Sequence, residues 1–250
     1  MRLYITLLPR EPVVLPIHYN HILQSAIYSN LGSKLGSLIH DEGYEHDSRT
    51  FKPLTFSRLN GTYRLDKTSG RISFDGPIRL VVSSPVEDIC HSLGTRLLLE
   101  GSIELAGQHV PVDSVEARSP VVLSNVMTVT TLSPIVVYST LTKADGSRYT
   151  CYFQPGESEF ERLASRNLIK KFQAILEADS PEGTLLIRPL RQPRLHIVYY
   201  KDTVIKGYSG RLRLEGPKEL ILLALNAGLG SKNSQGFGCL EAIGHYVEPN

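Results

Sequence analysis

The amino-acid sequence predicts an α+β fold made of two tandem copies of one β-α-β-β-α-β unit. In the first half, strand patterns and helical apolar patterns alternate in that order. The second half repeats the order and ends in a glycine-rich segment and a short strand. This order is that of the ferredoxin-like unit, and 250 residues suffice for two such domains. The predicted boundary near residues 114–119 gives domains 1–115 and 116–250.

In the first half, a helix is predicted over residues 18–31, where apolar residues recur at helical spacing. The polar residues 41–50 predict a loop. A second helix is predicted to begin near Ser83, because serine caps helices and Pro85 suits a first turn, and to end near Leu93 and Gly94. Strands are predicted at residues 2–8, 52–59, 70–74, 78–82 and 97–105.

In the second half, the clearest helix is predicted over residues 160–176, and a last helix runs from Pro217 to Ala227. Segments rich in valine and threonine predict strands at residues 120–131 and 135–141. A long hairpin is predicted over residues 185–200 and 204–214, and a short strand over 239–243.

Composition narrows the class of protein. Hydrophobic content of 41%, charged content of 21% and the lack of a long apolar run are typical of a soluble globular protein. Cys90, Cys151 and Cys239 lie far apart, which argues against a disulfide framework and favours the cytoplasm. The histidines and cysteines show no ligand spacing, so the sequence predicts no metal site and no cofactor. Metal-free acid–base chemistry by His, Tyr or Lys remains.

The glycine-rich segment near the C-terminus holds two G-x-G pairs, Gly228/Gly230 and Gly236/Gly238, with five residues between them. Backbone N–H groups of such a loop can face an anion, and Lys232 adds a positive charge. Nucleotide-binding loops follow a strand and open a helix, whereas this segment follows a helix and precedes a strand. A plain connection that begins with a helix-capping glycine is the alternative.

Positive charge gathers on the predicted hairpin. Between residues 187 and 213 there are seven basic residues and one acidic residue. A basic stripe on paired strands is typical of a phosphate-binding surface, although a solvated sheet face has the same composition. The arginines predicted to contact phosphates are Arg188, Arg191, Arg194, Arg211 and Arg213.

Three residues of the first half can carry acid–base chemistry. Tyr28 lies on the first predicted helix, His40 opens the polar loop, and Lys52 begins the next strand. The end of a helix and the start of the next strand share one edge of a β-α-β unit, so these side chains can converge. The alternatives are a core tyrosine, a loop histidine and a solvated lysine.

The glycine-rich segment resembles that of the RAMP superfamily of CRISPR-associated proteins, most closely the repeat-processing endoribonucleases of the sixth Cas family. In that family, two G-apolar-G pairs flank five residues close to the C-terminus. Many members also use a tyrosine on the first helix, a histidine at or after its end, and a lysine before an aromatic-rich strand. Tyr28, His40 and Lys52 match these positions, with His46 or Tyr44 as substitutes.

The resemblance implies metal-independent cleavage of CRISPR repeat RNA into guide RNAs. An RNA 2′-hydroxyl would attack the neighbouring phosphate, leaving a 2′,3′-cyclic (or 3′) phosphate and a 5′-hydroxyl. His40 would transfer a proton with Tyr28 as its partner, and Lys52 would stabilise the phosphate charge. The arginines, Lys232 and the four glycines would bind RNA. Further partners would be effector-complex subunits or a second copy of the chain.

Two other interpretations remain open. A non-catalytic RAMP subunit that binds guide RNA in an effector complex would share the loop without needing Tyr28, His40 and Lys52. A generic ferredoxin-like RNA-binding domain would need exposed aromatic residues on a central strand, for which the hairpin offers only the pair Tyr199 and Tyr200.

Overall fold

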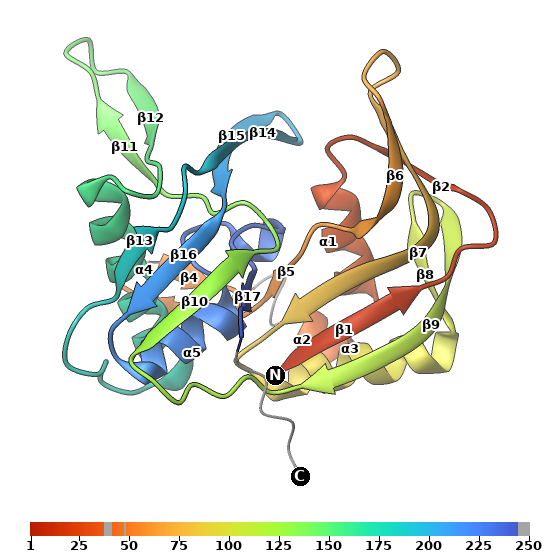
Figure 1. Ribbon diagram of the computed structural model, residues 1–250, viewed down its shortest axis with the longest axis horizontal. Helices are drawn as coiled ribbons and strands as arrows, with labels where there is room; N and C mark the ends of the chain where they lie inside the picture. The colour runs from red at the N-terminus through yellow and green to blue at the C-terminus, as the bar shows by residue number, and fades with distance from the viewer. Residues whose placement is uncertain (38–41, 48, 245–250) are drawn as a thin grey trace.

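The computed structural model describes residues 1–37, 42–47 and 49–244. Two antiparallel sheets lie side by side, and the longer helices lie behind them (Figure 1). The fold is therefore α+β, as predicted. No helix in the described ranges is both long and apolar enough to cross a membrane.

The first sheet has the strand order β2-β7-β1-β9-β8, and β5 and β6 also pair with β7. Its helices are α1 (Asn20–Ser29), α2 (Ser33–Ser37) and α3 (Glu87–Glu100). Its strands are β1 (Arg2–Leu7), β2 (Val13–Pro16), β5 (Thr55–Phe56), β6 (Asn60–Asp66), β7 (Arg71–Ser83), β8 (Ser102–Leu105) and β9 (Gln108–Arg118).

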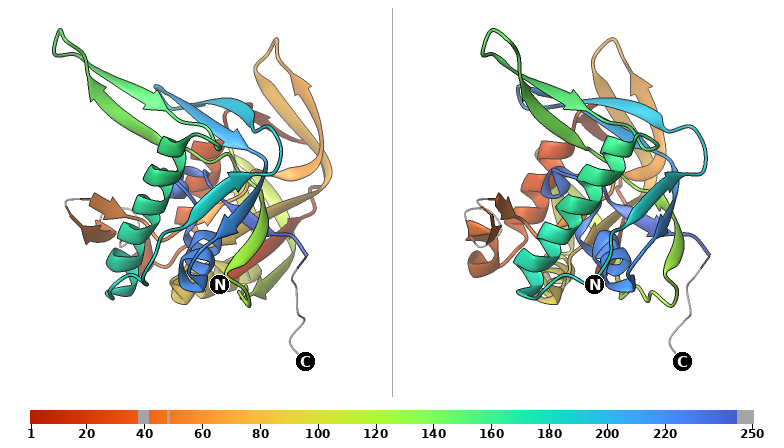
Figure 2. Two further views of the ribbon diagram at one scale, coloured as in Figure 1. Left: turned by 60° about the vertical axis from the view of Figure 1, so that its left-hand side comes forward. Right: turned by 90° about the vertical axis from the view of Figure 1, so that its left-hand side faces the viewer.

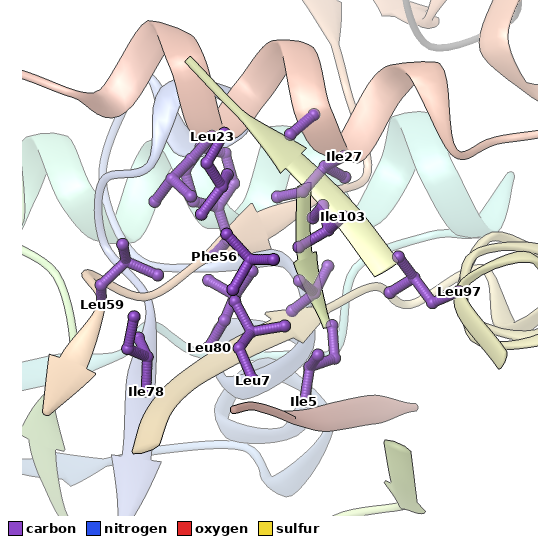
Figure 3. Packing of buried hydrophobic residues seen from close by; sticks show 14 of the residues in the cluster. Ile5, Leu7, Leu23, Ile27, Phe56, Leu59, Ile78, Leu80, Leu97 and Ile103 are labelled. Atoms are coloured by element: carbon purple, nitrogen blue, oxygen red, sulfur yellow. The ribbon is translucent and has the colours of Figure 1, made fainter. Parts of the chain in front are cut away.

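Alternation along β1 explains how this sheet is covered. Ile5 and Leu7 point to one face, where they pack with Leu23 of α1, Phe56 of β5 and Leu97 of α3 (Figure 3). Tyr4 and Thr6 point to the opposite face because successive strand side chains alternate. One face of the sheet is thus the core, and the other is open.

The second sheet has the strand order β13-β16-β10-β17 and is covered on one face by α4 (Ser158–Leu176) and α5 (Lys218–Ala227). Leu212 and Leu214 of β16 belong to the core beneath these helices. The strands are β10 (Val126–Thr131), β13 (Leu186–Pro189), β16 (Arg211–Glu215) and β17 (Leu240–Ala242).

Three hairpins stand apart from the two sheets. The hairpin of β11 (Tyr138–Thr142) and β12 (Arg148–Tyr152) extends well away from the body of the protein, as Figure 2 shows. The second joins β14 (Arg194–Tyr200) to β15 (Thr203–Ser209). The third joins β3 (Tyr44–His46) to β4 (Arg49–Phe51) and packs against α4. Its Phe51 is buried in the core of the second half.

Several predicted elements are confirmed in place: the first strand, the helix that carries Tyr28, α4, α5 and the last strand. The predicted end of α3 is wrong. Gly94 lies in the middle of that helix, against Leu3 and Val115. The helix ends at Glu100 and is capped by Gly101, which has a φ of 65°. The strand predicted over residues 97–105 therefore begins only at Ser102.

Other boundaries also differ from the prediction. Part of the predicted loop 41–50 forms the β3–β4 hairpin, and only Thr55–Phe56 of the predicted strand 52–59 is a strand. The segments 70–74 and 78–82 belong to the single strand β7. The hairpin over residues 185–214 turns where predicted but is divided into four strands. Because β9 continues to Arg118, the first sheet extends past residue 115.

Candidate active site

One buried lysine of α4 donates hydrogen bonds to the glycine-rich loop. Lys171 is 5% exposed, and its Nζ donates to Gly228 O at 2.9 Å, Gly230 O at 2.8 Å and Asn233 Oδ1 at 2.6 Å. Burial lowers the pKa of Lys171 to about 7. Asn233 Nδ2 in turn donates to Leu229 O at 3.2 Å and Phe237 O at 3.0 Å. No sequence pattern indicates this role for Lys171, which lies on the predicted helix 160–176 with no motif around it.

The second glycine pair contacts the first half of the chain. Gly236 has a φ of 83°, and a Cβ there would lie 2.5 Å from Cε2 of Phe56. Asn20 Nδ2 donates to Gly236 O at 3.1 Å, and Thr55 Oγ1 donates to Phe237 O at 3.1 Å. Glycine is needed at position 236 because its φ is positive and because the side chains of Phe56 and Asn20 leave no space for a Cβ.

Several loop N–H groups already donate to carbonyl oxygens of the chain. Leu229 N donates to Gly238 O, Gly238 N to Pro134 O and Ser231 N to Val136 O. These three N–H groups are therefore not available to an anion. The loop also carries the half-buried side chains of Ser231, Lys232 and Ser234, which a ligand can contact.

Tyr28 lies on α1 beside this loop. Gln24 Nε2 donates to the Tyr28 hydroxyl at 3.4 Å, and that hydroxyl also hydrogen-bonds the side chain of Ser234. Burial raises the pKa of the Tyr28 phenol. The phenol is therefore protonated at neutral pH and suited to donate a proton.

Lys52 is fixed between two cores. The preceding Phe51 is buried in the core of the second half, and Leu54 in that of the first half. Lys52 lines a cleft of about 680 Å³ whose other wall is the glycine-rich loop. The basic residues in its wall are Arg49, Lys52, Lys171 and Lys232.

Ser234 of the loop lies beside one predicted catalytic residue and shares a cleft with another. Tyr28 hydrogen-bonds Ser234, and Ser234 and Lys52 are both among the residues that line the 680 Å³ cleft. His40 lies outside the described residues. The substitutes named above lie on β3: His46 Nε2 is 3.7 Å from Asp47 Oδ2, and Tyr44 packs against the second core. Among the described residues, no group of three or more His, Cys, Asp or Glu is arranged to hold a metal ion.

The five predicted RNA-binding arginines are exposed, and those on the second sheet lie away from the loop. Arg188 of β13 lies opposite Arg213 of β16, on the face that does not carry Leu212 and Leu214. This face of the second sheet is turned away from α4, and we call it the open face. Arg213 Nε is 3.6 Å from Glu215 Oε2. The structure separates Lys232, at the loop, from Arg188, Arg211 and Arg213 on this face of the second sheet.

A second cleft, of about 340 Å³, extends the open face between the two sheets. Arg58 and Arg79 line it together with Tyr4 and Glu241. Glu241 is opposite Thr130, which is opposite Arg211 on the other side, so the arginine face leads into this cleft. No sequence pattern indicates Arg58 and Arg79, because Arg58 follows β5, Arg79 lies in β7, and only the fold brings the two together.

Comparison with known proteins places the chain among CRISPR-associated proteins. Residues 116–242 match the family model described as CRISPR associated protein Cas6, C-terminal. The CRISPR-associated endoribonuclease Cas6 1 of Methanocaldococcus jannaschii is 26% identical over 247 residues, which cover 95% of this chain and 91% of that protein. The solved structure of a Cas6-related protein from Pyrococcus furiosus has a TM-score of 0.84 at 24% identity, covering 97% of this chain and 98% of the other. A Cas6 product complex has a TM-score of 0.69 at 19% identity, covering 97% and 98%.

Proposed function

The chain belongs to the Cas6 family of CRISPR-associated proteins, and on this premise we propose that it is an endoribonuclease that cleaves CRISPR repeat RNA into guide RNAs. The observation that carries the proposal is that Tyr28 hydrogen-bonds Ser234, and that Ser234 and Lys52 line one cleft together with other basic residues. A protonated phenol and several cations suit the cleavage of a phosphodiester. The name of the M. jannaschii relative supports the same activity.

The proposed reaction needs no nucleophile from the protein. The 2′-hydroxyl oxygen forms a bond to the neighbouring phosphorus, the bond from phosphorus to the 5′-oxygen breaks, and a 2′,3′-cyclic phosphate results. We assign to His40 the removal of the 2′-hydroxyl proton and to Tyr28 the protonation of the leaving 5′-oxygen. Each such group typically contributes on the order of 10²–10⁴-fold. Lys52 would stabilise the charge that grows on the phosphate.

We assign RNA binding to two surfaces, the glycine-rich loop and the open face of the second sheet. Lys232 would contact the RNA at the cleavage site, and the open face would hold a more distant stretch through Arg188, Arg211 and Arg213. Arg191 would bind RNA from the segment between β13 and β14, and Arg194 from the start of β14. We assign the four glycines to the shape of the loop rather than to phosphate contacts, because all four have a positive φ and a Cβ at any of them would meet another atom of the chain within 2.6 Å.

We also interpret the two halves as tandem ferredoxin-like domains. In the second half, the chain order β10-α4-β13-β16-α5-β17 and the sheet order β13-β16-β10-β17 support this interpretation. Association with effector-complex subunits or with a second copy of the chain stays a prediction. A non-catalytic RNA-binding subunit is the alternative that the following experiment excludes or supports.

The test is cleavage of a labelled CRISPR repeat RNA in EDTA by the wild-type protein and by His40→Ala. We expect one cut that survives EDTA, leaves a 5′-hydroxyl and is lost in the variant. A repeat with 2′-deoxyribose at the cleaved position should remain intact, since it lacks the nucleophile. Tight binding without any cut would favour the non-catalytic subunit. A cut that His40→Ala leaves unchanged would keep the nuclease and move the base to His46 or Tyr44.

A further inference from the structure

The hairpin of β14 and β15 reaches across to α1 at Tyr200. The Tyr200 hydroxyl donates to Gln24 Oε1, and Gln24 Nε2 donates to the Tyr28 hydroxyl at 3.4 Å. The ring of His21 meets that of Tyr200 edge to face, with centroids 6.5 Å apart. Tyr200 also packs against the small apolar cluster that contains Val198 and Phe237. The residue is thus fixed both at its ring and at its hydroxyl.

The direction of these hydrogen bonds decides what Tyr28 can do. A glutamine amide has one accepting oxygen and one donating nitrogen. Since Tyr200 donates to the oxygen, the nitrogen of Gln24 is turned to Tyr28. The Tyr28 oxygen accepts that hydrogen bond, so its own proton is directed away from Gln24 and can be donated to another group.

We propose that Gln24 and Tyr200 are positioning residues that orient the Tyr28 hydroxyl as a proton donor for the reaction. The inference rests on the proposed function, because it requires Tyr28 to protonate the leaving oxygen. Under this proposal, Tyr200 of the second half completes a site whose proton donor, Tyr28, lies on helix α1 of the first half. A purely structural role, in which the contact only docks the hairpin on α1, predicts different kinetics.

Tyr200→Phe tests the idea by removing one oxygen atom. Cleavage is measured in single turnover with protein in excess over labelled repeat RNA, which separates binding from chemistry. We expect the rate at saturation to fall about 3- to 10-fold, as for one lost hydrogen bond, with RNA binding unchanged. Tyr199→Phe is the matched control on the same strand, since its ring is half exposed, and it should cleave like the wild type.

The double variant Tyr28→Phe/Tyr200→Phe separates positioning from an independent effect. If Tyr200 acts through Tyr28, the double variant cleaves at the rate of Tyr28→Phe alone. A further loss equal to that of Tyr200→Phe by itself would overturn the inference. If Tyr28→Phe is impaired but Tyr200→Phe is not, positioning by Tyr200 is wrong and the proposed function stands. If Tyr28→Phe cleaves like the wild type, the role of Tyr28 under the proposed function is wrong, and the inference fails with it.

Gln24→Glu supplies a readout that docking alone would not change. An ionised carboxylate accepts from Tyr200 but cannot donate to Tyr28, whereas a protonated one can do both. The deficit of Gln24→Glu relative to the wild type should therefore shrink as the pH falls. A deficit that stays constant across the pH range would refute the proposed direction of the hydrogen bonds.

Discussion

Lys171 links the stability of the protein to pH in a way that one substitution can test. Its ammonium is buried against three oxygen acceptors, and burial lowers its pKa from 10.5 to about 7. Between these two values, the unfolded chain binds a proton at Lys171 that the folded protein has released. Stability therefore rises with pH across this window, and Lys171→Met should remove that rise.

The magnitude follows from the two pKa values. The slope contributed by one group approaches about 1.4 kcal/mol per pH unit once the folded form is deprotonated. Integrated from pH 7 to pH 9, Lys171 contributes about 2 kcal/mol of additional stability. The assay is urea unfolding of wild type and Lys171→Met at pH 7, 8 and 9. Other groups that titrate in this range are common to both proteins and cancel in the difference.

Lys170→Met is the matched control from the next position of the same helix. Lys170 Nζ pairs with Asp47 Oδ2 at 2.8 Å, and Asp47 is 63% exposed, so this variant should keep the pH dependence of the wild type. Parallel stability curves for wild type and Lys171→Met would refute the reasoning. They would mean that the three acceptors compensate the ammonium fully for its lost hydration.

Three further predictions concern the loop, the cleft and the open face. Gly236→Ala should lower the free energy of unfolding, measured in urea, by about 2–4 kcal/mol, because the new Cβ would overlap Phe56 at a positive φ. The control is Gly146→Ala, which should cost only about 1–2 kcal/mol, because Gly146 has a φ of 81° but open space around it. Lys52→Ala should slow single-turnover cleavage by about 10²-fold with RNA still bound, and an unchanged rate would exclude Lys52 from the reaction. The double variant Arg188→Ala/Arg211→Ala should make the slope of log RNA affinity against log salt concentration shallower by roughly 1.4, which is about 0.7 for each lost contact to a single-strand phosphate. The control Arg162→Ala should leave this slope unchanged, because Arg162 pairs with Glu159 on α4.

Local patterns predicted the long helices well and the small strands badly. The apolar stripe of α4 extends over five turns and could hardly be mistaken, whereas β5 has two residues and exists only because it pairs with Ser83 and Val82. Gly94 was read as a helix end although it lies within α3, because sequence cannot distinguish a capping glycine from one in a helix packed against a sheet.

Local patterns likewise predicted some residues of the candidate site and not others. Tyr28 and Lys52 could be selected from the sequence because each stands in a recognisable pattern, whereas Lys171, Gln24 and Tyr200 stand in none. These three act through contacts between segments that are distant in sequence, such as the 176 positions between Tyr200 and Gln24. The arginines form a cluster in the sequence, but only the strand pairing shows that Arg188 and Arg213 lie on the face of the sheet that is turned away from α4.

The burial of Phe51 bears on how the protein can come apart. A chain cut after residue 118 would expose this phenylalanine on the first fragment and leave a hole in the core of the second. The first fragment would lose the burial of Phe51, and the second would lose part of its core. The two halves therefore depend on each other for stability. Heating should therefore melt the protein in a single transition, and a ligand that tightens either half should raise the melting temperature of the whole.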